Sequence, residues 1–135
     1  MQVLKDEIRN NILEAAKRLF YEKGYNNASL RDIANKSGIT VGNVYRYFAN
    51  KECVLEGVVY PVYSKIMDYI ELSESYIKAG ESKTFEDFRN EINDYILRIT
   101  KEYRLEMLIL FKGTQGTKFE KTRSELVSLI ENRIY

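Results

Sequence analysis

The 135-residue sequence contains no histidine and a single cysteine, Cys53. Without histidine there is no His-based nucleophile or general base, and one cysteine supports neither a zinc site of the usual Cys/His kind nor a disulfide within the chain. No apolar run approaches the roughly 20 residues that a bilayer-spanning helix needs, and the charged start is unlike a signal peptide. We therefore expect a cytoplasmic protein with no metal, no cofactor and no membrane segment.

Chain breakers are also scarce, with one proline and seven glycines, which favours long helices. The chain is 44% apolar and 30% charged, as in a soluble globular protein, and its net charge of +1 indicates no partner by itself. The charges are uneven, however. Residues 1–55 hold nine Lys and Arg against six Asp and Glu, whereas residues 56–135 hold twelve against fourteen. This asymmetry is compatible with a polyanion-binding front region followed by a region with another task.

Three helices are expected in the first 50 residues. Apolar side chains recur at helical spacing over residues 4–23, and a glycine follows. Ser29 is an N-cap candidate for a second helix, and Asp32 stands at the third position, where a capping box places an acid or amide. Gly38 can end that helix, and Thr40 can cap a third helix that extends for about eight residues.

Helical spacing continues through the second half of the chain. Asn50 can cap a long fourth helix, in which Pro61 should produce a kink because it removes a hydrogen bond. Thr84 can cap a fifth helix, an apolar sixth segment covers residues 103–111, and a last amphipathic helix is expected over residues 118–135. No strand-like alternation occurs, so we expect an all-α fold with units at residues 1–50 and 51–135.

The second and third expected helices, with the tight glycine-containing turn between them, form a helix-turn-helix arrangement. Val44 and Phe48 would face the core, which leaves a surface with one charge and two large rings outside. Such a surface suits a DNA groove, because small residues allow close approach and Asn43 can read a base edge. The alternative is a tight helical corner inside an ordinary bundle. The outward residues are Thr40, Val41, Gly42, Asn43, Tyr45, Arg46 and Tyr47.

Residues 8–55 resemble the TetR/AcrR family of bacterial transcriptional regulators in many spacings at once. The resemblance implies an N-terminal helix-turn-helix domain and a C-terminal helical domain for ligand binding and dimerisation. It further implies a homodimer on a near-palindromic operator, usually a repressor that a small molecule releases from DNA. The segments that carry it are ILEAA from Ile12, Leu19-Phe20, Gly24-Tyr25, SLRDIA from Ser29, Gly38-Ile39, VYRYF from Val44 and NKECVL from Asn50.

The resemblance also implies roles for individual residues. Ser29 would hold a phosphate, Arg31 would reach a base or a phosphate, and Lys51 would brace the DNA backbone. The leading face of the recognition helix would comprise Thr40, Val41, Gly42 and Asn43, and Tyr45 and Tyr47 would contact phosphates beside Arg46. Tyr47 departs from the family, which often has histidine there, and Gly42 departs from a good helix former.

Beyond residue 55 the resemblance rests only on helix order and on the long fourth helix. Aromatic side chains are abundant there and could line an apolar ligand cavity, although aromatics at helical spacing are more often core residues. The candidate pocket residues are Tyr63, Tyr69, Phe88, Tyr95, Tyr103, Met107 and Phe111. The ligand itself is not indicated by the sequence.

Two other functions remain as alternatives. An enzyme would need convergent acids or nucleophiles, but the acids lie at solvent-facing helix positions without histidine. A helical protein-interaction module could retain this fold without specific DNA binding. Family members usually continue with two more helices that form a dimer interface, whereas this sequence stops at Tyr135 in mid-pattern. We therefore expect either a truncated chain or a different mode of dimerisation.

Overall fold

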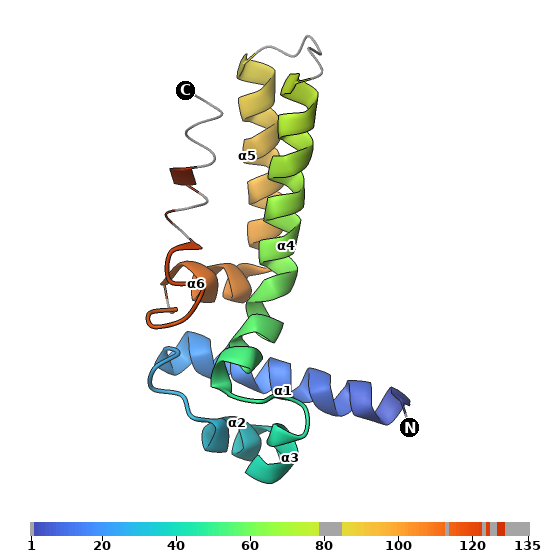
Figure 1. Cartoon of the computed structure of the whole chain (residues 1–135), viewed down its shortest axis with the longest axis vertical. Coiled ribbons are helices and arrows are strands. Elements are labelled where there is room, and N and C mark those ends of the chain that lie inside the picture. Colours follow the sequence, from blue (N-terminus) through green and yellow to red (C-terminus); the bar gives the residue numbers. More distant parts are fainter. Residues whose placement is uncertain (1, 79–84, 113, 123, 125–126, 129–135) are drawn as a thin grey trace.

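A computed structural model describes residues 2–78, 85–112, 114–122, 124 and 127–128. These residues form six helices and include no strand, which confirms the expected all-α class. The helices are α1 (Gln2–Lys23), α2 (Leu30–Ser37), α3 (Val41–Tyr45), α4 (Lys51–Lys78), α5 (Phe85–Glu102) and α6 (Arg104–Lys112). Figure 1 shows α1, α2 and α3 at one end of the molecule and the paired rods of α4 and α5 at the other.

The ends of α1 and α2 and the starts of α2 and α3 lie where the glycines and capping residues of the sequence predict. Gly24 and Gly38 follow α1 and α2 with φ of 82° and 73°, a left-handed conformation that glycine adopts without a Cβ penalty. Ser29 caps α2, and its side chain and that of Asp32 complete the capping box. Thr40 caps α3 by accepting the Asn43 amide at 3.1 Å.

The core of the N-terminal unit, which we call the head (residues 2–50), lies where α1 packs against α2 and α2 packs against α3. Ile12, Ala16, Ile33 and Val44 in this core are almost completely buried. Burying an aliphatic side chain of valine or isoleucine size contributes about 1.5–3 kcal/mol. The head is therefore held by apolar contacts from all three of its helices.

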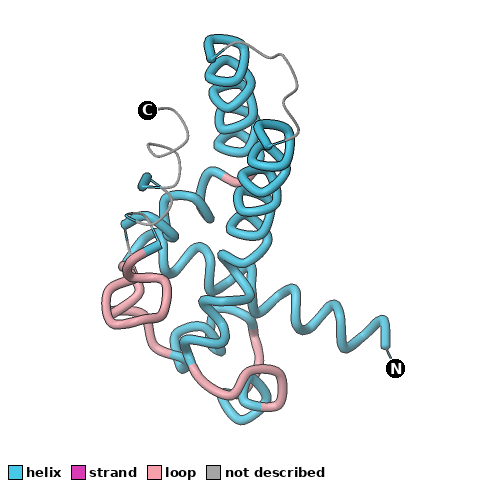
Figure 2. Tube along the Cα trace, turned by 45° about the horizontal axis from the view of Figure 1, so that its top comes forward, coloured by secondary structure: helices cyan, strands magenta, loops and turns pink. Residues whose placement is uncertain are grey.

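The long helix α4 leaves the head and runs beside α5, as Figures 1 and 2 show from two directions. It continues through Pro61 as a single helix, and the kink expected there stays a prediction. Tyr69 and Tyr95 stack between the two rods with ring centroids 4.1 Å apart. The Tyr95 hydroxyl also donates to the Lys65 carbonyl at 2.9 Å, so α4 and α5 are joined by both apolar and polar contacts.

Helix α6 is separate from α5, because the chain turns at Tyr103. It packs against α1, α4 and α5 and thereby connects the head to the rods (Figure 1). None of the helices in the part of the chain that is described has the length and apolar character of a membrane span.

The segment after α6 begins with turns, and the helix expected from residue 118 starts later, since Thr122, Ser124, Val127 and Ser128 are helical. Residues 115–121 are turn or bend, and Phe119 is buried against Tyr63 at a centroid separation of 6.1 Å. The Thr114 hydroxyl donates to the Phe119 carbonyl at 3.2 Å, which closes this turn on itself. Most of the predicted last helix, including Leu126, Leu129, Ile130 and Ile134, lies outside the described residues.

Candidate nucleic-acid interface

The turn between α2 and α3 consists of residues 38–40 and is fixed by backbone hydrogen bonds. The Gly38 amide donates to the Asn35 carbonyl at 3.2 Å, and the Ile39 amide donates to the Ala34 carbonyl at 3.1 Å. These bonds satisfy carbonyls that the end of α2 would otherwise leave free. Together with the Thr40 cap they hold α3 at one orientation to α2, which a rigid reading element requires.

Helix α3 has one anchored side and one open side. Val44 is 0% exposed and Phe48 is 6% exposed, and the Arg9 guanidinium lies over the Phe48 ring at 5.4 Å from its centroid. On the open side, the Tyr45 side chain is 54% exposed. Thr40, Gly42 and Arg46 are also exposed or partly so, and Val41, Asn43 and Tyr47 complete the same surface.

The helix is shorter than its predicted range of residues 40–48. It ends at Tyr45, and Arg46 and Tyr47 form a turn in which the Tyr47 amide donates to the Val44 carbonyl at 3.0 Å. This turn brings Phe48 into the core, and Tyr47 packs against the same core from the outside. The structure therefore gathers the predicted residues 40–47 on one end of the head.

Ser29 and Arg31 lie at the start of α2. The Ser29 amide donates to Asp32 Oδ2 and the Asp32 amide donates to Ser29 Oγ, both at 3.0 Å. Hydrogen bonds from Ser29, first from its backbone and then from its side chain, lower the pKa of the Asp32 carboxyl. Ser29 Oγ accepts from the Asp32 amide in this box, and its hydroxyl hydrogen faces the Asp32 carboxyl, from which it would have to turn to reach a phosphate oxygen. Arg31 is exposed beside it.

The charge of the α2–α3 segment is positive. Within residues 29–48 the basic residues are Arg31, Lys36 and Arg46, all exposed, and the one acid is Asp32. Asp32 is engaged by the Ser29 cap, so the three cations face solvent with little local compensation. A surface of this sign attracts the DNA backbone.

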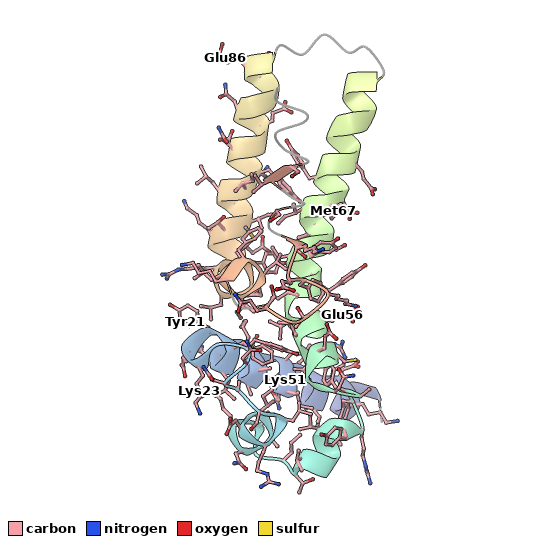
Figure 3. All side chains as sticks on the ribbon, turned by 60° about the vertical axis from the view of Figure 1, so that its left-hand side comes forward. Tyr21, Lys23, Lys51, Glu56, Met67 and Glu86 are labelled. Carbon is pink, nitrogen blue, oxygen red and sulfur yellow. The ribbon has the colours of Figure 1, made fainter. Side chains whose placement is uncertain are left out.

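Lys51 has a different environment from the other predicted contact residues. Its ammonium donates to the Tyr25 carbonyl at 2.8 Å and to the Ala28 carbonyl at 3.1 Å, and it lies 4.2 Å from the centroid of the Tyr25 ring. Burial lowers the pKa of this ammonium. Two of its three N–H groups thus hold the α1–α2 connection against the first turn of α4, and one is left for any phosphate. Figure 3 labels Lys51 near the start of α4.

The predicted ligand-pocket residues do not lie on one common wall. Met107 and Phe111 line a pocket of about 600 Å³ beside α6. Tyr63 packs on Phe119, and Tyr103 lies under the Lys65 ammonium at 5.3 Å. Tyr69 and Tyr95 form the stacked pair between the rods, and the side chain of Phe88 is outside the described residues.

A second pocket, of about 440 Å³, lies between α6 and the end of α1. Both pockets are lined by Arg104, Leu108 and Lys112, which no motif in the sequence marks. The sequence pattern that could have revealed them is a polar-apolar-polar series at four-residue spacing within an otherwise apolar segment, because this spacing places all three on one helical face.

Comparisons with known proteins agree with the geometry of the head. Residues 12–58 match the sequence model of the bacterial regulatory proteins of the tetR family. The HTH-type transcriptional regulator UidR of Escherichia coli is 32% identical over 59 residues, which are 44% of this chain and 30% of that protein. The HTH-type transcriptional regulator TtgR of Pseudomonas putida is 40% identical over 53 residues, 39% of this chain and 25% of that protein.

The fold likeness extends beyond the head. A TetR-family transcriptional regulator from Bordetella parapertussis 12822 superposes with a TM-score of 0.68 at 22% identity, over 93% of this chain and 62% of that one. The chain thus spans less than two thirds of that structure, and its matching part spans less than a third of the two curated relatives. All these matches are to regulators of transcription and none of the three is to an enzyme. Residues 12–58 therefore carry the sequence pattern of the bacterial regulatory proteins of the tetR family, and the described helices carry the fold of a regulator from that family.

Proposed function

We propose that the chain is a sequence-specific DNA-binding regulator of transcription whose helix α3 enters the major groove. The observation that carries this proposal is the two-sided character of α3. Val44 and Phe48 anchor its inner side, while its outer side is exposed and short in charge. A major groove admits a helix of this kind, and small side chains let its backbone approach the base edges.

Sequence would be read by the leading face of α3. Asn43 is the residue with two hydrogen-bonding groups at its tip, which suits adenine in the major groove. The methyl groups of Thr40 and Val41 can meet a thymine methyl, and Gly42 allows close approach. Each well-placed bidentate contact discriminates against the wrong base by about 1–3 kcal/mol.

Register on the duplex would be set by contacts to phosphates. Ser29 and Arg31 supply donors at the start of α2, and Tyr45, Arg46 and Tyr47 supply them after α3. Lys51 belongs mainly to the fold, since it binds the Tyr25 and Ala28 carbonyls. Its role on DNA would then be indirect, through the position of α2 relative to α4.

The assembly we propose is a homodimer on a near-palindromic operator. Two copies related by a two-fold axis would present two α3 helices, and half-sites would lie about one helical turn of DNA, roughly 34 Å, or a multiple of it apart. Such a protein acts on chromosomal DNA, so its place would be the bacterial cytoplasm.

Regulation would follow from a second site outside the head. We propose that a small molecule favours a state in which the two heads are wrongly spaced, so that it removes a repressor from its operator by population shift. Helix α6 is placed to transmit this change, because it packs against α1 of the head and against α4. Across this contact, Lys17 Nζ of α1 lies 3.9 Å from Glu106 Oε1 of α6.

A second connection joins the turn after α6 to the first turns of α4. The Lys118 amide donates to Glu52 Oε1 at 2.7 Å, and the Lys118 ammonium pairs with Glu56 Oε2 at 2.8 Å. The hydrogen bond to Glu56 raises the pKa of this ammonium. We call these three residues the clasp, and we propose that it couples movement of α6 to the head.

DNA binding is tested first by gel retardation on random duplex at low salt, where even non-specific binding should be visible. Selection of bound sequences from a random pool should then yield a near-palindrome. Asn43→Ala should relax the preference at one position of each half-site. Asn93→Ala, a change at an exposed residue on α5, is the matched control and should leave the selected sequence unchanged. Absence of any retardation would instead favour an interaction module without DNA binding.

A further inference from the structure

The two pockets beside α6 flank a single stripe of that helix. Arg104, Leu108 and Lys112 follow one another at four-residue spacing and line both pockets. The smaller pocket is completed by Phe20, Tyr21 and other residues at the end of α1. The two hollows therefore form one surface that extends from the head to the body of the molecule.

The larger pocket combines an apolar floor with a cationic rim. Met107 is buried and Phe111 is half-buried, whereas Lys101, Arg104 and Lys112 are exposed. Among the described residues that line either pocket there is no Asp or Glu. Glu102 and Glu106 are near in sequence but line neither pocket, and Glu106 is directed toward Lys17 of α1.

The cations at the rim of the larger pocket differ in their ion pairing from other lysines of the chain. Lys118 is paired with Glu56, and Lys17 is paired with Glu14 at 2.9 Å. The described residues provide no ion pair for Lys101, Arg104 or Lys112. Three cations with no acidic partner among the described residues, placed around an apolar hollow, are complementary to a molecule with one anionic end and one apolar end.

We propose that this surface binds a small amphipathic anion, with its apolar part against Met107 and Phe111 and its anionic group at Lys101, Arg104 and Lys112. The volume of about 600 Å³ lies within the range of small-molecule sites. A duplex or an acidic protein would need a continuous basic track, whereas here the cations surround a hollow. This inference rests on the proposed function, since it names the chemical class of the effector.

The position of the surface would let occupancy affect the head. Arg104 and Lys112 lie on the helix that packs against α1, and Tyr21 and Phe20 of α1 form the opposite wall of the smaller pocket. An anion drawn between Arg104 and Lys112 would alter the contact of α6 with α1. The bound molecule would thus act at the junction of the two units, without contacting α3.

The test uses calorimetric titration of the whole chain, without DNA, with three ten-carbon probes below their self-association concentrations. Decanoate carries the anion, decanol is neutral and decyltrimethylammonium is a cation. We expect decanoate to bind most tightly and the cation to show no binding. The paired change Arg104→Gln with Lys112→Gln should weaken decanoate about three- to tenfold per cation and leave decanol unchanged. The matched control Arg98→Gln, a change at an exposed residue outside both pockets, should alter neither.

Charge reversal at a single exposed site gives an independent reading if the double variant folds poorly. Lys101→Glu should weaken decanoate more than the neutral probe while the melting temperature stays near that of the wild type. Equal binding of all three probes, no binding of decanoate, or charge variants without effect would overturn the proposal. Failure of DNA retardation with normal decanoate binding would contradict the regulator instead, so the two proposals can fail separately.

Discussion

At the scale of single residues, Gly42 on the exposed surface of α3 occupies a position where the fold does not require glycine. A Cβ added at Gly42 would meet only Thr40 Oγ1, at 3.9 Å, which is ordinary van der Waals contact. Alanine also favours a helix over glycine by up to about 1 kcal/mol. Nothing in the folded head therefore demands glycine here, and we attribute it to close approach of DNA.

The change Gly42→Ala should separate stability from binding. We expect the free energy of unfolding to stay equal or rise by about 0.5 kcal/mol, because the space is open and the helix is favoured. Affinity for a selected operator should fall about tenfold or more, because the added methyl group would stand between α3 and the groove. Urea unfolding and gel retardation measure the two effects. Unchanged affinity would show that α3 does not approach DNA at this position.

Asp32 gives a prediction about pH. Its hydrogen bonds with Ser29 lower the pKa of the carboxyl in the folded state. A lowered folded pKa contributes stability that is present above the unfolded pKa and is lost as pH falls through the folded pKa. Asp32→Asn should therefore reduce the stability at neutral pH and flatten its fall in acid. Thermal melts of the two proteins from neutral pH to about pH 3 measure this, and parallel pH profiles would contradict it.

At the scale of elements, Lys51 joins the connection between α1 and α2 to the start of α4. Replacing it with methionine keeps much of the side-chain length but removes both hydrogen bonds and leaves the Tyr25 and Ala28 carbonyls without these donors. We expect Lys51→Met to lower the free energy of unfolding by about 1–3 kcal/mol. Urea denaturation measures this loss.

The same variant distinguishes a structural brace from a phosphate contact. Loss of one phosphate contact should reduce the slope of log affinity against log salt by about one unit. For Lys51→Met we expect weaker DNA binding with an unchanged salt slope, whereas Arg31→Gln should reduce the slope. A reduced slope in Lys51→Met would assign its remaining N–H group to the duplex.

Local signals explain why the first helices could be predicted from the sequence. Glycine at positions 24 and 38 and the caps at Ser29 and Thr40 act within a few residues, so their effect is visible in the chain itself. The early end of α3 could not be predicted because the turn at residues 46–47 serves the burial of Phe48. The break at Tyr103 has no local signal, because neither glycine nor proline marks it.

The parts of the site that depend on distant residues could not be predicted. Lys51 binds carbonyls 23 and 26 positions earlier in the chain, so its sequence neighbours reveal nothing of that role. The rim of cations around α6 follows from the approach of α5 and Val127 to that helix. Aromatic residues of the second half could be predicted as core candidates, and Tyr69 and Tyr95 show that role in their stacked pair.

At the scale of the whole molecule, the head is joined to the rods by the packing of α1 against α4 and α6, and the clasp of Glu52, Glu56 and Lys118 ties the turn after α6 to the first turns of α4. The clasp is partly exposed, with Glu56 and Lys118 side chains 42% and 54% accessible. An exposed ion pair contributes about 1 kcal/mol or less to stability. The clasp would matter mainly because it holds the turn at residues 114–122 in place against α4.

Removal of the clasp should thus change dynamics more than stability. In the double variant Glu52→Gln, Glu56→Gln we expect the free energy of unfolding to change by no more than about 1 kcal/mol. Amide hydrogen exchange at Lys118 should become faster, because its acceptor at Glu52 is weaker. The exposed pair of changes Glu7→Gln, Glu22→Gln on α1 serves as a control. Equal exchange rates in all three proteins would show that the clasp does not hold this turn.

The central claim is that α3 reads bases in the major groove. Methylation interference on a selected duplex tests it directly, since dimethyl sulfate modifies guanine N7 in the major groove and adenine N3 in the minor groove. The account predicts that methylation at guanine N7 in base pairs that α3 covers, including those beside the adenine read by Asn43, prevents binding because the added methyl group stands in the major groove, and that methylation at adenine N3 there does not. Interference from adenine N3 alone, or from neither position, would contradict it.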